Sequence, residues 1–297
     1  MLSILIPVYN FDVIELIENL DSQARKAKID FEIIAVDDAS EDKYKTKNRK
    51  INTLPNVRYF EESQNNGRAR VRNKLAEYAR FNNLLFIDCD SEILDKNFIL
   101  NYLEHCRQNE VICGGLEYVK RVPQDKSYYL RWLYGTKREY KNARDRNKNP
   151  NASFSSFNFL INKDVFDQIK FNETITNYGH EDTLFGYELK KRNIIIKHID
   201  NPMVHIGLET NEEFIKKTKE GIENLKQLMK QNGYEKVFIK DITLLNYFKF
   251  LQRIRLSKLF RYLFNKLEKR LYNYLVKNKP NILFFDLFKL GYLCSIN

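Results

Sequence analysis

Paired acidic residues follow two apolar runs of the sequence. The run LLFI leads into Asp88-Cys89-Asp90, and FEIIAV leads into Asp37-Asp38. Two carboxylates at one strand end can face a common site, and their oxygens are the ligands that Mg²⁺ and Mn²⁺ prefer. A carboxylate after a neighbouring strand can bind the base or ribose of a nucleotide. These acids indicate a site for a nucleotide and a metal-bound diphosphate. The alternative for each pair is a solvated turn or a helix cap.

A cluster of arginines opens a predicted helix. Arg68, Arg70 and Arg72 lie within the segment NGRARVRN, directly after a glycine. Arginines near a helix N-terminus suggest an anion nearby, because both the guanidinium and the free backbone N–H groups attract negative charge. A solvated basic face is the alternative for at least one of the three.

Two further segments carry groups suited to catalysis or metal binding. Glu181-Asp182 follows Gly179-His180, and an acid after such a turn can take a proton from a hydroxyl group. His205 lies in NPMVHIG, a predicted turn, where an imidazole can complete a metal site begun by Asp90. A helix cap and a structural histidine are the respective alternatives.

The elements that position these residues alternate in type. Apolar strand patterns at 2–7, in FEIIAVDDAS, in VRYFEE and in NLLFIDCDSE are separated by helical patterns within the first ninety residues. This alternation predicts an α/β fold with a doubly wound, mostly parallel sheet, in which ligands bind beyond the carboxyl ends of the strands. The chain has neither G-x-G-x-x-G after its first strand nor a P-loop, which argues against those nucleotide folds.

The remaining sequence limits the class of protein. Among its 297 residues there are four cysteines without C-x-x-C spacing, and no apolar run approaches the roughly 20 residues of a membrane span. The N-terminus has no basic region typical of a signal peptide, so we expect a cytoplasmic protein. We expect one strand in EVICGGLEYV, a mobile loop or helix over the site at 123–150, and an amphipathic helix at 211–231.

Taken in order, these segments resemble the GT-A glycosyltransferases, and among them the inverting enzymes of family 2. The matching motifs are ILIPVYN, VDDAS, NNGRARVRN, FIDCD, YGHED and NPMVH, which cover roughly residues 1–210. The resemblance implies a GT-A catalytic domain at 1–210, with a nucleotide-binding half at 1–100 and an acceptor-side half at 101–210. A basic helical extension would occupy 211–297.

The resemblance also implies roles on the donor side of the site. Pro7 and Tyr9 would line the base pocket, and Asp38 would bind the uracil or ribose of a nucleotide-diphospho-sugar. Arg72 would approach the donor phosphates or order the pocket. Asp88 would contact the ribose or the donor sugar.

On the reactive side, the resemblance implies that Asp90 and His205 ligate Mn²⁺ or Mg²⁺. Asp182 would be the catalytic base, and Glu181 would bind the sugar or the acceptor. The metal and the arginine would neutralise the departing diphosphate while the acceptor hydroxyl attacks from the opposite face, which inverts the anomeric centre.

Several positions depart from the usual family pattern. Ala39 stands where glycine is common, Val71 replaces alanine, Cys89 is the centre of D-x-D, and His180 replaces glycine or tryptophan. None removes an expected catalytic group, but His180 changes the expected acceptor pocket. Four aromatic residues of the central loop, within 123–150, are candidates for sugar stacking, with ordinary packing as the alternative: Tyr128, Tyr129, Trp132 and Tyr134. Asn158 is a candidate for facing the donor sugar.

Positive charge is concentrated at the end of the chain. The net charge is +11, of which residues 236–297 contribute +10. Within 248–277, leucines and aromatic residues alternate with Lys and Arg, a pattern that suits an anionic membrane surface or, alternatively, a helical cap or oligomer contact. A nucleic-acid partner is not expected, because the near-neutral body offers no basic reading surface.

The resemblance therefore implies a hexosyl- or N-acetylhexosaminyltransferase. Its donor would be a UDP-sugar and its acceptor a glycan or lipid-linked glycan in cell-surface polysaccharide synthesis. It would be cytoplasmic or peripheral on the inner face of the membrane. A nucleotidyltransferase of similar fold is an alternative, but IPVYNFDVIE lacks the expected glycine- and lysine-rich loop. A degenerate membrane-binding protein is another, but it predicts loss of the acids at 38, 90 or 182, and all are present.

Overall fold

The computed structural model describes residues 1–107, 109–175, 178–230 and 241–296. These residues form two compact units. Unit 1 comprises residues 1–119, 140–176 and 181–207, and unit 2 comprises residues 120–139, 177–180 and 208–297. The segment 120–139, which contains helix α5 (Tyr129–Tyr134), therefore groups with the C-terminal helices.

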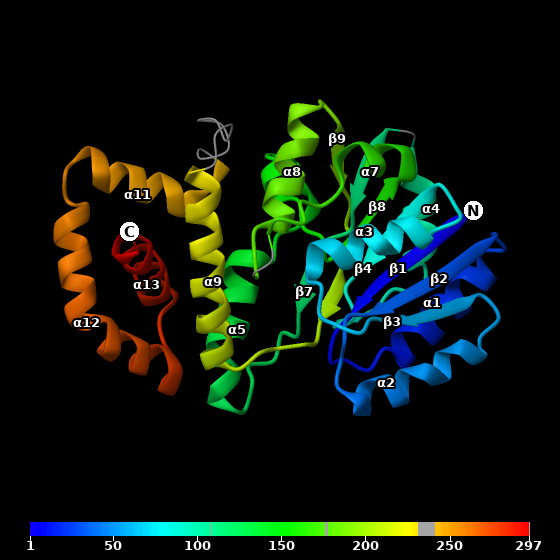
Figure 1. The fold of residues 1–297 in the computed structure, drawn as a ribbon, viewed down its shortest axis with the longest axis horizontal. Coiled ribbons are helices and arrows are strands. Elements are labelled where there is room, and N and C mark those ends of the chain that lie inside the picture. The colour runs from blue at the N-terminus through cyan, green and yellow to red at the C-terminus, as the bar shows by residue number, and fades with distance from the viewer. Residues whose placement is uncertain (108, 176–177, 231–240, 297) are drawn as a thin grey trace. The chain divides into compact units, whose positions relative to one another are not determined.

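Unit 1 is built on a seven-stranded sheet of order β3-β2-β1-β4-β8-β6-β9 (Figure 1). Strands β3, β2, β1 and β4 are parallel to one another, and β9 is parallel to β6. Only β8 runs antiparallel, to both β4 and β6. The predicted mostly parallel sheet is confirmed. The strands are β1 (Leu2–Val8), β2 (Phe31–Asp37), β3 (Val57–Glu61), β4 (Asn83–Ile87), β6 (Glu110–Cys113), β8 (Asn158–Asn162) and β9 (Ile195–His198).

Helices cover both faces of this sheet, which explains why its strands are apolar on both sides. One face packs against α1 and α4 through residues such as Ile4 and Leu85. The other packs against α3, α7 and α8 through residues such as Leu5 and Phe86. The helices of unit 1 are α1 (Ile14–Lys26), α2 (Asp42–Asn48), α3 (Arg68–Tyr78), α4 (Phe98–His105), α6 (Ala143–Arg146), α7 (Lys163–Ile169) and α8 (Glu181–Lys191).

A second, three-stranded sheet corrects two sequence predictions. EVICGGLEYV is not one strand: β6 ends at Cys113, and β7 (Leu116–Tyr118) joins the small sheet of order β5-β10-β7. NPMVHIG is not simply a turn, because β10 (Met203–His205) pairs with both β7 and β5 (Ser91–Glu92). The pairing of His205 with Ser91 brings two distant motifs to one place.

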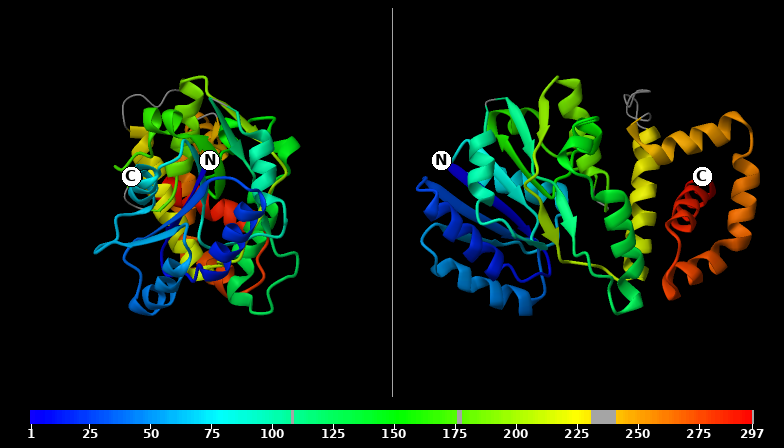
Figure 2. Two further views of the ribbon diagram at one scale, coloured as in Figure 1. Left: turned by 90° about the vertical axis from the view of Figure 1, so that its right-hand side faces the viewer. Right: turned by 180° about the vertical axis from the view of Figure 1, so that it is seen from behind.

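Unit 2 is helical. Helix α9 (Asn211–Lys230) matches the predicted amphipathic helix, and α13 packs against α9, α11 and α12 (Figure 2). The amphipathic pattern of 248–277 is divided between two helices, because α11 ends at Arg253 and Arg255 has a φ of +59°. No helix among the described residues is long and apolar enough to cross a membrane. The other helices are α5 (Tyr129–Tyr134), α11 (Thr243–Arg253), α12 (Ser257–Lys277) and α13 (Ile282–Ser295).

The aromatic residues of the central loop pack within unit 2. Tyr134 contacts the rings of Phe214 and Phe285, at centroid distances of 5.4 Å each. Tyr129 and Trp132 contact each other at 5.8 Å. These contacts favour the packing interpretation of the aromatic cluster over sugar stacking, most clearly for Tyr134.

Candidate active site

The parallel strands β2, β1 and β4 end at one edge of the sheet, and four of the nine predicted site residues follow them there. All nine of these residues belong to unit 1. Tyr9 follows β1 and is exposed, with Pro7 half-buried before it. Asp38 follows β2, and Asp88 and Asp90 follow β4.

Asp38 anchors the loop that enters α3. Its Oδ1 accepts a hydrogen bond from the backbone N–H of Asn66 at 2.7 Å, and its Oδ2 accepts one from Gly67 at 2.9 Å. Asp37 is structural, because its two oxygens accept from the Ser40 backbone and the Tyr59 hydroxyl. Each oxygen of Asp38 keeps a second lone pair, so the predicted contact with a nucleotide is compatible with this anchoring role.

Asp90 and His205 face each other. His205 Nε2 lies 3.2 Å from Asp90 Oδ2, and His205 Nδ1 is buried without a hydrogen-bond partner among the described residues. Burial raises the pKa of Asp90, but the hydrogen bond and charge of His205 and the charge of Arg68 outweigh it and hold that pKa below its usual value. Asp90 is therefore an ionised carboxylate beside an imidazole nitrogen.

This pair fits a divalent cation. Two ligands at roughly 2.1 Å from an octahedral ion, at right angles, are about 3 Å apart, close to the observed separation. The described residues contain no group of three or more His, Cys, Asp and Glu side chains arranged to hold a metal. A cation here would have few protein ligands, as is usual for Mg²⁺ that also binds substrate phosphates.

The three-stranded sheet and one glycine allow Asp90 and His205 to lie close together. The backbone N–H of Ile206 donates to the carbonyl of Asp90 at 2.9 Å. A side-chain Cβ on Gly207 would lie 2.6 Å from Cβ of Asp90, which is too close for any other residue. Gly207 was not singled out from the sequence, although its place two residues after His205 is a signal that could have found it.

The arginines of α3 form ion pairs with carboxylates of the protein itself. Arg72 is 1% exposed and donates a short hydrogen bond to Asp88, whose other oxygen lies 3.1 Å from Arg68. Arg70 pairs with Glu173 at the surface. The position of Arg72 favours ordering of the pocket over direct contact with donor phosphates, because its side chain is buried and bonded.

Arg68 joins the two acidic motifs. Its Nε lies 2.8 Å from Oε1 of Glu181, and its Nη2 contacts Asp88. Arg72 lies 4.0 Å from the same Glu181 oxygen. Two arginines and two carboxylates therefore form one network, which holds the start of α8 against the end of β4. The sequence indicated an anion near these arginines but not which one.

Asp182 stands beside this network, and no arginine among the described residues forms an ion pair with it. Its Oδ1 accepts a hydrogen bond from the backbone N–H of Thr183 at 2.6 Å. Burial, together with the negative charge of Glu181, raises the pKa of Asp182 to about 6. A carboxylate with this pKa is ionised at neutral pH and more basic than a solvated one, which suits a general base.

Two of the departures from the family pattern occupy strained backbone. Ala39 has a φ of +62° and His180 a φ of +69°, a region that favours glycine. A glycine at either position would adopt this conformation at lower cost. Cys89 is half-buried and packs against the core.

One candidate site residue is corrected. Asn158 does not face a donor sugar: it is 1% exposed, accepts a hydrogen bond from the Tyr102 hydroxyl at 2.6 Å, and donates to the Gly115 carbonyl. Gly114 leaves room for these contacts, because a Cβ there would collide with both Asn158 and Tyr102.

The sheet order, with acidic residues at the carboxyl ends of parallel strands, defines a GT-A glycosyltransferase fold. Solved structures agree. The mannosyltransferase PcManGT from Pyrobaculum calidifontis aligns with a TM-score of 0.58 at 12% identity, over 98% of this chain and 85% of that one. TarS of S. aureus aligns with a TM-score of 0.53 at 17% identity, over 99% of this chain and 54% of that one.

The family follows from the sequence comparison. A model of glycosyl transferase family 2 matches residues 3–170, more than half of the chain, and the chain belongs to that family. It is 27% identical to the chondroitin synthase of Escherichia coli over 237 residues. That match covers 69% of this chain but only 34% of the relative, so the chain spans about a third of its length. The family decides against the nucleotidyltransferase alternative.

Proposed function

We propose that this chain is an inverting glycosyltransferase that moves a hexosyl or N-acetylhexosaminyl group from a nucleotide-diphospho-sugar, a UDP-sugar in the first instance, to a hydroxyl group of a glycan or lipid-linked glycan. The observation that carries the proposal is the network of Arg68, Asp88 and Glu181. It joins the D-x-D segment to the start of α8, and this supports a role for Asp182 beside the donor.

The similar structures support the nucleotide-sugar part of this proposal. The PcManGT structure is a complex with GDP-Man and Mn²⁺. A TarS structure in complex with UDP-GlcNAc aligns over 98% of this chain with a TM-score of 0.50. The two donors differ in base and sugar, so we propose the UDP-sugar on the resemblance of the motifs and leave its sugar to a screen.

The residues of this chain have separable tasks in the proposed reaction. Asp182 accepts the proton of the acceptor hydroxyl as that oxygen bonds to the anomeric carbon. The bond from this carbon to the diphosphate oxygen breaks, and the nucleoside diphosphate leaves with its electron pair. Arg68 and Arg72 hold Asp88 and Glu181 in position through ion pairs. Asp38, with Pro7 and Tyr9 beside it, would hold the nucleoside, and Glu181 would orient the sugar or acceptor.

Asp90 and His205 would hold Mn²⁺ or Mg²⁺. Such an ion supplies positive charge that stabilises a departing diphosphate. The ionised state of Asp90 and its 3.2 Å separation from His205 support this assignment.

The first test is calorimetric titration of UDP into the protein, with and without Mn²⁺. We expect binding that requires Mn²⁺ and that Asp90→Asn weakens. Metal-independent binding of equal strength would contradict the cation assignment. Absence of binding in both conditions, for UDP and for other nucleoside diphosphates, would favour a degenerate enzyme.

A further inference from the structure

Exposed apolar side chains gather on the C-terminal helices. Of the 20 large apolar side chains that are exposed among the described residues, 11 lie between residues 247 and 287. They come from α11, α12 and α13, and the turn between the first two. A surface this rich in exposed apolar side chains marks a site of contact with another body.

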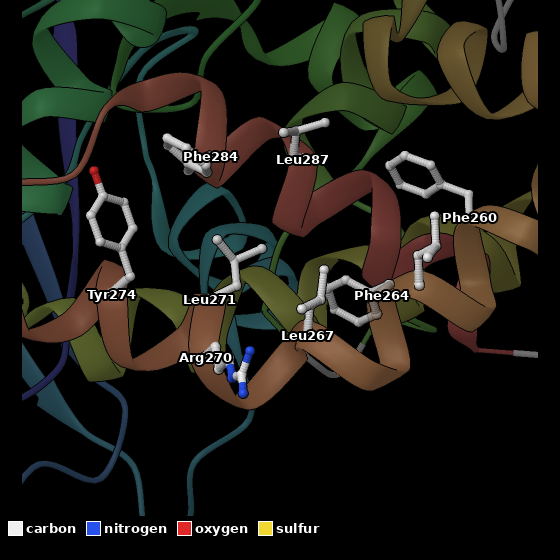
Figure 3. A pocket seen from close by; sticks show the side chains of 9 residues that line it. Phe260, Phe264, Leu267, Arg270, Leu271, Tyr274, Phe284 and Leu287 are labelled. Atoms are coloured by element: carbon white, nitrogen blue, oxygen red, sulfur yellow. The ribbon is translucent and has the colours of Figure 1, made fainter.

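The centre of this surface is a groove of about 520 Å³ between α12 and α13, here called the α12–α13 groove. Figure 3 shows side chains from the two helices pointing toward one another across it, while the guanidinium group of Arg270 points away. Gly291 lets α13 approach Phe264 closely, since any side chain there would collide with that ring. The lining is almost wholly apolar: Phe260, Leu263, Phe264, Leu267, Arg270, Leu271, Tyr274, Phe284 and Leu287.

Cations border the groove. At about 3.6 residues per turn, Lys266, Arg270 and Lys277 share the face of α12 that carries Leu259 and Leu263. Between residues 243 and 295 the chain has 11 Lys and Arg residues and two acids. Nine of these cations are exposed and form no ion pair with an acid of the described chain: Lys249, Arg253, Arg255, Lys258, Lys266, Lys269, Arg270, Lys277 and Lys279.

The two acids of this segment do not offset that charge at the surface. Glu268 pairs with Lys219 of α9 at 2.7 Å. Asp286 pairs with Arg138 at 2.6 Å and Lys289 at 2.9 Å. Both carboxylates are therefore engaged within unit 2, and the groove keeps an unbalanced positive border.

We propose that the α12–α13 groove and its cationic border dock this protein on an anionic phospholipid membrane, with acyl chains against the groove. Charge decides between the possible occupants. A second copy meeting this surface through the same face would bring two strongly basic segments together, which repel. An anionic bilayer offers negative headgroups beside an apolar layer, matching both parts of the surface.

The structure also redraws the membrane segment expected from the sequence. The pattern at 248–277 suggested one amphipathic stretch, but α13 supplies part of the surface through Leu283, Phe284 and Leu287, which are exposed. The proposed apolar contact with the membrane thus depends on two antiparallel helices, α12 and α13, which only the fold brings together. This inference concerns unit 2 alone and stands whether or not the proposed transferase activity is found.

Vesicle flotation of the full chain tests the proposal. We expect binding to vesicles of phosphatidylcholine with phosphatidylglycerol, weak or no binding to phosphatidylcholine alone, and loss of binding at high salt. Equal binding to both vesicle types, or none to the anionic ones, would overturn it.

Variants that remove positive charge should weaken vesicle binding more than variants that remove apolar side chains. Replacing Lys266, Lys269 and Arg270 together by Gln should weaken binding about a hundredfold, because each surface cation contributes roughly fivefold. The matched control replaces Lys26, Lys28 and Lys50, exposed cations of unit 1, by Gln and should bind as the parent does. An equal loss in both triple variants would overturn the assignment to this surface.

Apolar variants test the groove itself. Leu263→Ser with Leu267→Ser should weaken binding by about tenfold or more, since half-exposed leucines lose part of their transfer free energy. Leu94→Ser, at a more exposed leucine of unit 1, is the control. Circular dichroism of each variant verifies folding, and unaltered binding by the folded double variant would contradict insertion.

A fluorescent reporter locates the contact independently of affinity. In a chain with Trp132 replaced by Phe, Phe284→Trp should be quenched by phospholipids brominated on their acyl chains, while Ile195→Trp of unit 1 should not. Absence of quenching at 284 would overturn the proposal. So would a dimer in light scattering that dissociates on Leu263→Ser, because it would assign the groove to a second copy.

Discussion

The arginines of α3 and those of the C-terminal helices meet opposite environments. Arg72 is buried in a network with Asp88 and Glu181, and Arg68 bridges the same two acids. Arg253, Arg255 and Arg270 are exposed and have no acidic partner among the residues that the structure describes.

The comparison shows how one residue type serves two purposes. A buried guanidinium needs an acidic partner, because an unpaired buried charge is costly, and so it fixes the geometry of the side chains around it. An exposed and unpaired one costs little and leaves its charge available to an external anion. The predictions below test this division between the site and the C-terminal surface, in order of decreasing effect.

The largest effect is expected at Asp182. Asp182→Asn should lower the rate of transfer by about 10²–10⁴-fold, because the acceptor hydroxyl loses its base, while donor binding stays unchanged. The rate is measured with a soluble acceptor, and the released nucleoside diphosphate is the quantity detected. Arg270→Gln should leave the same assay unaltered. Normal transfer by the Asn variant would remove Asp182 as the base.

Removal of the buried arginine should be costly for folding. Arg72→Met should lower the free energy of unfolding by about 3–5 kcal/mol, because it leaves Asp88 and Glu181 with one arginine fewer in a buried site. Arg270→Met should change it by less than about 0.5 kcal/mol. Urea unfolding followed by circular dichroism compares the two, and equal losses would break the comparison.

A smaller effect is expected at Asp90, which with His205 forms the proposed cation site. Asp90→Asn should weaken Mn²⁺-dependent nucleotide binding by about 10–100-fold, since a charged oxygen ligand becomes a neutral one. Lys266→Gln, on the C-terminal surface, should not change it. Calorimetry with and without chelator measures both variants.

The raised pKa of Asp182 predicts the pH dependence of transfer. Its acid form predominates below about pH 6 and cannot accept a proton, so the rate should fall roughly tenfold per pH unit as the pH decreases below that value. Above it the rate should level off. A plateau extending down to pH 4, near the usual value for aspartate, would contradict the raised pKa.

The smallest effect concerns strained backbone in each region. Ala39→Gly should raise the free energy of unfolding by about 0.5–1 kcal/mol, because glycine adopts its positive φ at lower cost. Arg255→Gly, at the turn between α11 and α12, should give a similar gain. Ala24→Gly within α1 should instead lose about 1 kcal/mol, which controls for glycine's own effect.

Much of the fold could be predicted because its signals are local. The runs LSILIP and FEIIAV are apolar on both faces, as strands covered by two helical layers must be, and β1 and β2 confirm them. NPMVHIG misled, because the pairing of β10 depends on β5 and β7, more than eighty residues away along the chain. Asn158 misled for a similar reason: its partners come from α4 and from the segment after β6.

By itself, the sequence determined the types of residue at each strand end and the order of the elements that carry them, because periodicity and composition are properties of short segments. It also determined that positive charge gathers at the end of the chain. Only the tertiary structure decided which charges are partners. Arg68 reaches Glu181 across more than a hundred residues, and α12 and α13 meet around a groove, because packing, and not spacing along the chain, sets the distances over which charges and apolar surfaces interact.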